Sequence, residues 1–92
     1  MIFEWDENKN KLNQRKHGIS FEEAVRVFAD PNLKIVLDPE ESEIRWDAVG
    51  LVGKMLFVVF TERGQNTLRI ISARKATKRE INGYKNNDLR RS

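Results

Sequence analysis

The stretch MLFVVFTERGQNTLRIISAR, residues 55–74, decides the fold because two apolar runs flank a polar turn. Residues 55–61 form a continuous apolar run rich in valine and phenylalanine, which predicts a central strand. Residues 62–66 contain a glycine and predict a turn, and residues 67–73 predict the last strand. We therefore expect an antiparallel pair of strands at the centre of a sheet.

Two further strands are predicted on the N-terminal side of this stretch. In residues 44–49 the apolar side chains of Ile44, Trp46 and Ala48 alternate with other residues, which predicts a strand with one buried face. A tight turn at Gly53 and Lys54 joins this strand to the central one. The remaining predicted features are a strand at 33–37 and a polar turn at 38–42.

Helices are predicted at three places. Residues 20–30 begin with the capping box Ser20–Glu23, carry apolar residues at helical spacing and end before Pro31. A polar helix over 7–16 is expected between an N-cap at Asp6 and Gly18, after a short first strand at 2–5. A second capping box, Thr77–Glu80, begins the final helix.

The order β-α-α-β-β-β-β-α predicts a single α+β domain over residues 1–92. Strands that follow one another through short turns favour a mostly antiparallel sheet. Two N-terminal helices and one C-terminal helix are expected to flank it.

Composition excludes several kinds of protein. With one histidine and no cysteine, the usual zinc clusters are excluded, and no glycine-rich phosphate loop or serine nucleophile elbow is visible. We expect no metal and no cofactor. The acidic residues around 38–43 could bind a hard cation, but we favour a solvated loop. The longest apolar run, residues 55–60, is far shorter than the roughly 20 residues of a membrane helix. The first residues include acids and no long apolar run, so we expect no signal peptide, and the lack of cysteine suits the cytoplasm.

Charge is unevenly distributed along the chain. The net charge is +3, but residues 69–92 carry eight basic and two acidic residues and are +6, which leaves the rest at −3. A basic end on a mildly acidic body is typical of a surface that binds nucleic acid or an acidic partner. A basic helix end that is simply solvated is the alternative.

The remaining side chains suit cleavage of RNA without a metal. RNA supplies its own nucleophile, the 2′-hydroxyl, so an enzyme has to position the strand, stabilise charge and assist proton transfer. Arginine forms paired hydrogen bonds with phosphate oxygens. Arg74 is predicted just past the last strand, near the N-terminus of the final helix, and Arg45 and Arg63 on or beside the preceding strands. Their convergence on one patch is a hypothesis, since surface arginines also serve solubility.

Three other side chains have two interpretations each. His17 is either a partner of the helix end or a group that contacts phosphate or transfers a proton. Tyr84 either packs as core or stacks on a base. Glu80 is either the structural cap partner of Thr77 or a general base or arginine-orienting carboxylate.

Two long stretches resemble a known family. FEWDENKNKLNQRKHGISFEEAVRVFADP (3–31) and RIISARKATKREINGY (69–84) are similar to the BrnT family of bacterial toxins, and SEIRWDAVG and LFVVFTERG fit its middle strands. The resemblance implies a RelE-like ribonuclease toxin of a type II toxin–antitoxin pair. Such toxins cut RNA, block translation and are neutralised by an antitoxin that binds operator DNA.

The resemblance also implies site residues, position by position. The KHG motif places Lys16 and His17 in the first block of the family. The expected catalytic residues are Arg74, His17, Glu80 and Arg63, and the expected RNA- or phosphate-binding residues are Lys16, Arg45, Arg69, Lys78, Arg79 and Tyr84. The single acid at Glu43, where the family often has paired acids, departs from the pattern and leaves the role of Arg45 open.

A protein partner and an alternative function complete the expectations. The resemblance implies a BrnA-like antitoxin as partner, in a heterotetramer built on an antitoxin dimer, with operator DNA reached only through that antitoxin. The basic end fits equally a non-catalytic nucleic-acid-binding or corepressor module. The intact arginine set favours the ribonuclease.

Overall fold

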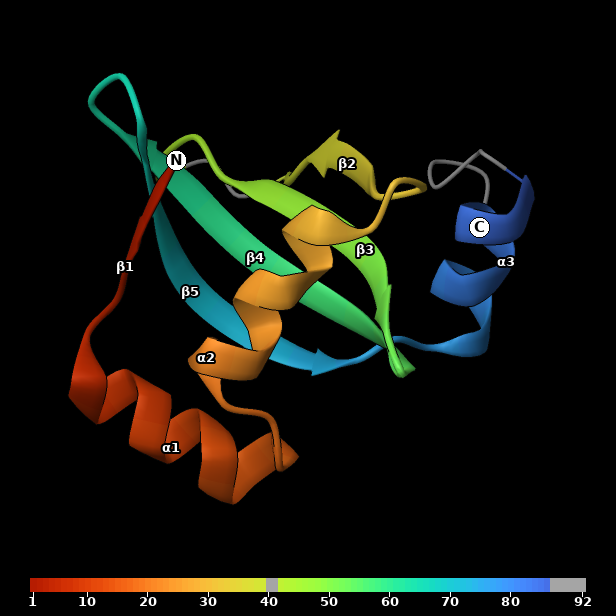
Figure 1. The fold of residues 1–92 in the computed structure, drawn as a ribbon, viewed down its shortest axis with the longest axis horizontal. Helices are drawn as coiled ribbons and strands as arrows, with labels where there is room; N and C mark the ends of the chain where they lie inside the picture. The colour runs from red at the N-terminus through yellow and green to blue at the C-terminus, as the bar shows by residue number, and fades with distance from the viewer. Residues whose placement is uncertain (40–41, 87–92) are drawn as a thin grey trace.

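The strands around residues 55–74 form the middle of a five-stranded sheet in the computed structural model, which describes residues 1–39 and 42–86 (Figure 1). β4 (Lys54–Arg63) pairs antiparallel with β5 (Thr67–Lys75) on one side and with β3 (Trp46–Val52) on the other. β2 (Lys34–Leu37) is one edge strand. β1 (Ile2–Glu4) is the other edge and runs parallel to β5. The sheet order is therefore β1-β5-β4-β3-β2, and the mostly antiparallel α+β fold is confirmed.

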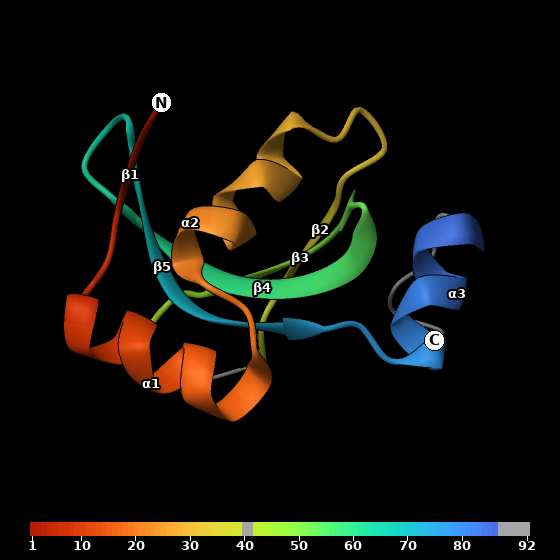
Figure 2. The same cartoon turned by 60° about the horizontal axis from the view of Figure 1, so that its bottom comes forward.

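The helices occupy different positions around this sheet. α2 (Phe21–Ala24) continues directly into the 3-10 helix η1 (Val25–Ala29), and together they cross one face of the sheet (Figures 1 and 2). α1 (Glu7–His17) packs against β5. α3 (Lys78–Asn86) follows β5 and contacts β3.

The hydrophobic core lies between the α2–η1 segment and the sheet. Ten buried residues form one cluster: Ile19, Phe21, Ala24, Val27, Ala48, Leu56, Val58, Phe60, Ile70 and Ala73. A Cβ built on Gly50 would lie 2.8 Å from the Cβ of Val27. The absence of a side chain at this position of β3 therefore lets η1 approach the sheet closely.

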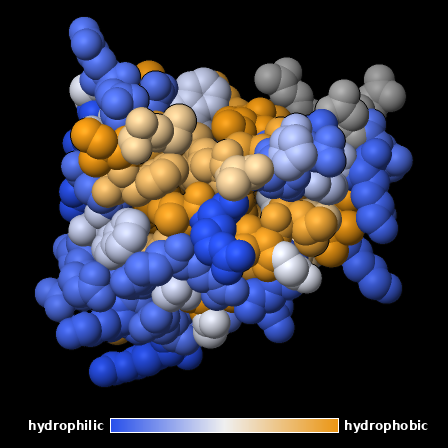
Figure 3. Space-filling model, in the orientation of Figure 1, coloured by the Kyte–Doolittle hydropathy of each residue, from blue (hydrophilic) through white to orange (hydrophobic). Residues whose placement is uncertain are grey.

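The polar helix α1 is held by two buried asparagines. The side chain of Asn13 donates to the carbonyl oxygens of Ile19 and Ala73 and accepts from the amide of Ala73. Asn10 accepts from the amide of Phe21. Asn13 therefore satisfies the edge of β5 beyond the end of β1, where a neighbouring strand would otherwise be needed. Leu12 is exposed instead, and Figure 3 shows a hydrophilic surface over α1, at the lower left.

The structure corrects three details of the prediction. Residues 47–50 of β3 are all buried, so this strand does not have a single buried face. α3 contacts β3, and Arg79 and Glu80 of this helix line one cavity together with Asp47. β5 extends to Lys75 and includes Arg74. The predicted helix over 20–30 is split, because its second half is a 3-10 helix.

Some predicted features lie outside the described residues. They are Glu40 and Glu41 of the polar turn, and Asp88, Arg90 and Arg91 of the basic end. No helix in residues 1–39 and 42–86 has the length and apolar character that crossing a membrane requires.

Candidate active site

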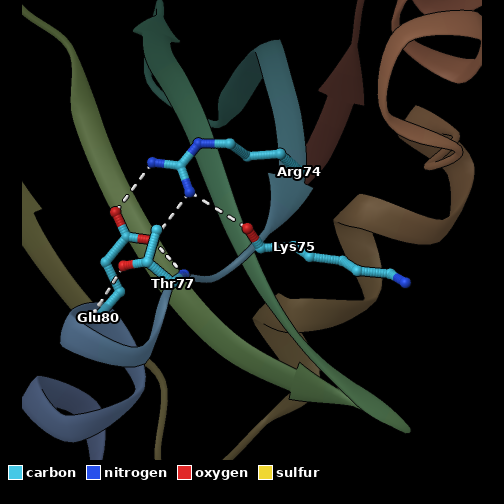
Figure 4. Close-up of polar contacts among 4 residues, drawn as sticks. All are labelled: Arg74, Lys75, Thr77 and Glu80. Atoms are coloured by element: carbon cyan, nitrogen blue, oxygen red, sulfur yellow. Dashed lines mark hydrogen bonds and ion pairs between the residues drawn. The ribbon is translucent and has the colours of Figure 1, made fainter.

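Arg74 and Glu80 form a two-pronged ion pair where β5 leads into α3 (Figure 4). Nη1 of Arg74 donates to Oε1 of Glu80 at 2.8 Å, and Nη2 donates to Oε2 at 2.9 Å. Nη1 also donates to the carbonyl oxygen of Lys75 at 3.1 Å. Although burial alone would raise it, the pKa of Glu80 is lowered by the hydrogen bonds from Arg74 and Thr77. The pair fixes the guanidinium in one orientation.

The predicted capping box at the start of α3 is present. The hydroxyl of Thr77 accepts from the amide of Glu80, and Oε1 of Glu80 accepts from the amide of Thr77 at 2.9 Å. Glu80 therefore caps the helix and orients Arg74 at the same time. These two interpretations of the residue are compatible.

The guanidinium of Arg74 keeps donors for a further partner. It lies over the ring of Phe57, with Cζ 4.1 Å from the ring centroid. An arginine has five N–H donors, and three are used by Glu80 and Lys75. Nε–H and the second N–H of Nη2 have no hydrogen-bond partner in the described part of the chain. These two donors point in the same direction and match the spacing of two phosphate oxygens.

A cavity of about 220 Å³ lies beside this ion pair, between α3 and the sheet face opposite the hydrophobic core. Its apolar wall comes from three strands and its polar rim from α3. The lining residues are Val36, Asp47, Val49, Phe57, Thr77, Arg79 and Glu80.

Asp47 is the buried charged residue of this cavity. It is 8% exposed, and its Oδ1 has no hydrogen-bond partner. Burial, together with a hydrogen bond and repulsion from Asp38, raises the pKa of Asp47 to about 7, although Arg74 opposes the shift. A hydrogen bond between two carboxyl groups requires that one of them carries a proton.

The other arginines predicted on strands are not among the lining residues of this cavity. Arg63 lies opposite Thr67, seven residues from Arg74 along β5, which is about 20 Å at strand spacing. Arg69 pairs with Glu4 at 2.8 Å, and Arg45 pairs with Glu43 at 2.9 Å. Arg63 therefore does not join Arg74 in one patch. The convergence of Arg45 with Arg74 stays a hypothesis, since Arg45 stands two residues before Asp47.

The predicted helix residues divide into two groups. Arg79 lines the cavity, and Lys78 is exposed beside it in the first turn of α3. Lys16 and His17 form the end of α1 and are not among the lining residues. His17 is half-buried there.

Tyr84 ties α3 to the core face of the molecule. Its hydroxyl donates to Oδ2 of Asp30 at 2.7 Å, and this oxygen also accepts from the amide of Leu51 at 2.8 Å. The hydrogen bond to Asp30 raises the pKa of Tyr84. In this arrangement Tyr84 supports the position of α3. This role differs from the two predicted ones, packing as core and stacking on a base.

Sequence reasoning missed Asp47, Asp38 and Phe57. Asp47 was placed on a solvent-facing side of its strand, because alternation alone does not show that a later helix covers that side. A signal was present, since Asp47 stands among Trp46, Ala48 and Val49 in a strand that is otherwise apolar. The predicted strands at 33–37 and 44–49 could have paired, but the register that places Asp38 near Asp47 is not specified by the sequence.

The fold and this cavity define a small α+β domain with an arginine–carboxylate site at the junction of the last strand and the last helix. The family described as "Ribonuclease toxin, BrnT, of type II toxin-antitoxin system" matches residues 5–80. The chain belongs to this family of ribonuclease toxins. A crystal structure of the Brucella abortus ribonuclease toxin BrnT is similar, with a TM-score of 0.65 and 27% sequence identity, covering 85% of this chain and 100% of the other. Comparison with curated protein sequences finds no match.

Proposed function

We propose that this protein is a metal-independent endoribonuclease that cleaves RNA by attack of the 2′-hydroxyl on the adjacent phosphate. The observation that carries the proposal is the guanidinium of Arg74, which is fixed by Glu80 and keeps two parallel donors beside a cavity. A phosphate bound there would receive charge stabilisation as the negative charge grows in the transition state. Membership of a ribonuclease toxin family supports the reaction class.

The surroundings of Arg74 support binding of an RNA strand. Arg79 on the cavity rim and the exposed Lys78 and Lys75 place further positive charge near the same junction. Such charges attract a polyanion without reading its sequence. The cavity walls of Val36, Val49 and Phe57 offer an apolar surface to a base or ribose.

The toxin function follows from the proposed reaction. Cleavage of cellular RNA would inhibit translation in the cytoplasm, and a cognate antitoxin of the BrnA type would neutralise the enzyme. We further propose a heterotetramer built on an antitoxin dimer, which would bring the toxin to operator DNA only through the antitoxin. A type II toxin–antitoxin family implies an antitoxin partner.

Analysis of RNA fragment ends tests the proposal. The pure chain is incubated with RNA, once in excess EDTA and once with Mg²⁺. Equal cleavage in both, with 2′,3′-cyclic phosphate or 3′-phosphate ends, is the expected result. Cleavage only with Mg²⁺ would contradict metal independence. Intact RNA in both conditions would favour the non-catalytic binding or corepressor module.

A further inference from the structure

Cleavage by the 2′-hydroxyl requires a group that removes its proton. The ideal pKa of such a group lies near the working pH, so that the group is available as a base and still accepts a proton readily. Arginine does not deprotonate in proteins. The cavity beside the ion pair of Arg74 and Glu80 is the Arg74 cavity. The proton acceptor must therefore be sought among the side chains that line it.

The described residues that line the cavity include two carboxylates, Glu80 and Asp47. Both oxygens of Glu80 already accept hydrogen bonds from Arg74, and Oε1 also accepts from the amide of Thr77. Removing Glu80 from this arrangement would release Arg74 and the start of α3. Glu80 is therefore a positioning residue.

Asp47, unlike Glu80, has a carboxyl oxygen that accepts no hydrogen bond. It is more than nine-tenths buried, yet Oδ1 has no hydrogen-bond partner and the residue lines the cavity. A buried carboxyl oxygen without a partner is costly for stability. Such an oxygen is understandable where a substrate group supplies the missing hydrogen bond.

The register places Asp47 diagonally across β4 from Arg74. Phe57 of β4 is opposite Arg74 on one side and Val49 on the other, and Asp47 is the next residue of β3 on the same face, opposite Val59. The charge of Arg74 acts on the Asp47 carboxyl group. The charged groups that act on Asp47 come from the surrounding elements: Asp38 after β2, Arg74 on β5 and Glu80 on α3, with Arg79 on the cavity rim.

We propose that Asp47 is the general base of the cleavage reaction, an inference that rests on the proposed ribonuclease function. Its carboxylate accepts the proton of the 2′-hydroxyl as O2′ forms a bond to phosphorus. The bond between phosphorus and O5′ breaks, O5′ keeps the electron pair and takes a proton from solvent water, and the 2′,3′-cyclic phosphate remains. Asp38 shares the proton of Asp47 between turnovers and so holds the base near neutrality.

The test compares wild type with Asp47→Asn, Asp38→Asn and a control, Glu62→Gln. The control changes an exposed carboxylate near the C-terminal end of β4. Cleavage of a short fluorescent RNA of mixed sequence is followed in EDTA from about pH 5 to about pH 9, and RNA binding is measured separately. Melting curves of all four proteins establish that they are folded.

The expected result separates rate from binding. Asp47→Asn should lower the rate at saturating RNA by about 10²- to 10⁴-fold, with RNA affinity within a few-fold of wild type. In wild type kcat/KM should rise with pH with a midpoint near 7. Asp38→Asn should move this midpoint to lower pH because it removes the like charge, and Glu62→Gln should leave it unchanged.

Two outcomes would overturn the inference while leaving the ribonuclease proposal intact. One is a folded Asp47→Asn protein that cleaves RNA at the wild-type rate with the same pH profile. The other is a loss confined to RNA affinity or to one preferred base, which would make Asp47 a base-binding residue. A wild-type protein that leaves RNA intact would overturn the ribonuclease proposal and this inference together.

Discussion

At the scale of single residues, the guanidinium of Arg74 has two edges with different roles. The edge formed by Nη1 and Nη2 holds Glu80, and the edge formed by Nε and Nη2 remains available. A lysine at this position would keep the charge but would lose the planar fork. The orientation of the guanidinium, rather than its charge alone, is what the fold supplies.

The first prediction is that Arg74→Ala abolishes toxicity in a protein that still folds. Loss of one charge-stabilising donor lowers turnover by about a hundredfold or more. Loss of the ion pair should lower the free energy of unfolding by only about 1 kcal/mol, because Glu80 still accepts a hydrogen bond from the amide of Thr77. Growth inhibition and melting temperature are measured beside the control Arg26→Ala, an exposed arginine on η1. Full toxicity of folded Arg74→Ala would rule out the clamp.

A second prediction concerns His17, which lies at the end of α1 and does not line the cavity. His17→Gln should therefore reduce cleavage by less than about tenfold, since general acid–base groups contribute about 10²- to 10⁴-fold. The rate at saturating RNA and the dissociation constant are measured together. A loss above a thousandfold with unchanged RNA affinity would make His17 a proton-transfer group.

The third prediction is a cost in stability at Asp47. The pKa is raised from 3.8 to about 7 on folding, so the native state binds more protons than the unfolded state between these values. Stability should therefore fall as pH rises from about 4 to about 7, by an amount of order 1 kcal/mol or more. Asp47→Asn removes this dependence. Denaturant unfolding at several pH values should show the variant gaining on wild type as pH rises, and parallel curves would contradict the raised pKa.

At the scale of secondary-structure elements, the two terminal helices are attached by polar contacts. α1 is fixed through Asn10 and Asn13, and α3 through Tyr84 and the ion pair of Glu80 with Arg74. α1 has little apolar surface to bury, so the hydrogen bonds of Asn10 and Asn13 determine where it lies. The α2–η1 segment, by contrast, packs through the hydrophobic core.

The fourth prediction tests this attachment at Asn13. Asn13→Ala removes the partners of the Ala73 amide and carbonyl and of the Ile19 carbonyl. Each buried backbone group left without a partner costs about 1–3 kcal/mol, so a total loss of several kcal/mol is expected by denaturant unfolding. The control Asn8→Ala, on the exposed surface of the same helix, should change stability by less than about 0.5 kcal/mol. Equal effects would show that Asn13 does not hold α1.

The elements were predictable where the signal is local. Period-two and period-3.6 patterns, glycine turns and both capping boxes identified the five strands and the helices within a few residues. The buried roles of Asn10 and Asn13 were not predictable, because a polar side chain in a polar helix gives no sign that it will face a strand edge. Asp47 differs, because its apolar neighbours in the strand are a sign of burial, but the helix that contacts this strand, α3, begins more than thirty residues later in the chain.

At the scale of the whole molecule, the sheet separates two surfaces of different character. One side carries a cavity of about 310 Å³ lined mainly by apolar residues, among them Met1, Ile35 and Trp46. The opposite side carries the Arg74 cavity, with Lys78 and Arg79 beside it. A partner protein can therefore recognise the basic surface or the apolar one, and only the first choice covers the candidate active site.

The last prediction is that the antitoxin inhibits by covering the basic surface formed by Arg74, Lys78 and Arg79. Residues 69–86 contain six basic residues and one acidic residue, whereas residues 1–68 carry a net −3, so an acidic segment of a partner would be steered to this end. Antitoxin and RNA should then compete, and binding should weaken with salt because exposed charges are screened beyond about 8 Å at physiological ionic strength.

Charge reversal distinguishes this arrangement from docking at the apolar cavity. Lys78→Glu with Arg79→Glu should lower antitoxin affinity at least about tenfold by calorimetry, since each residue would lose an attraction and gain a repulsion. Both substitutions place acids in the first turn of α3, where the helix dipole favours them, so the fold should persist. The control Lys9→Glu with Lys11→Glu makes the same change in charge on exposed α1. Unchanged affinity of the α3 variant, or an equal loss in the α1 control, would place the antitoxin elsewhere, with the apolar cavity as the next surface to test.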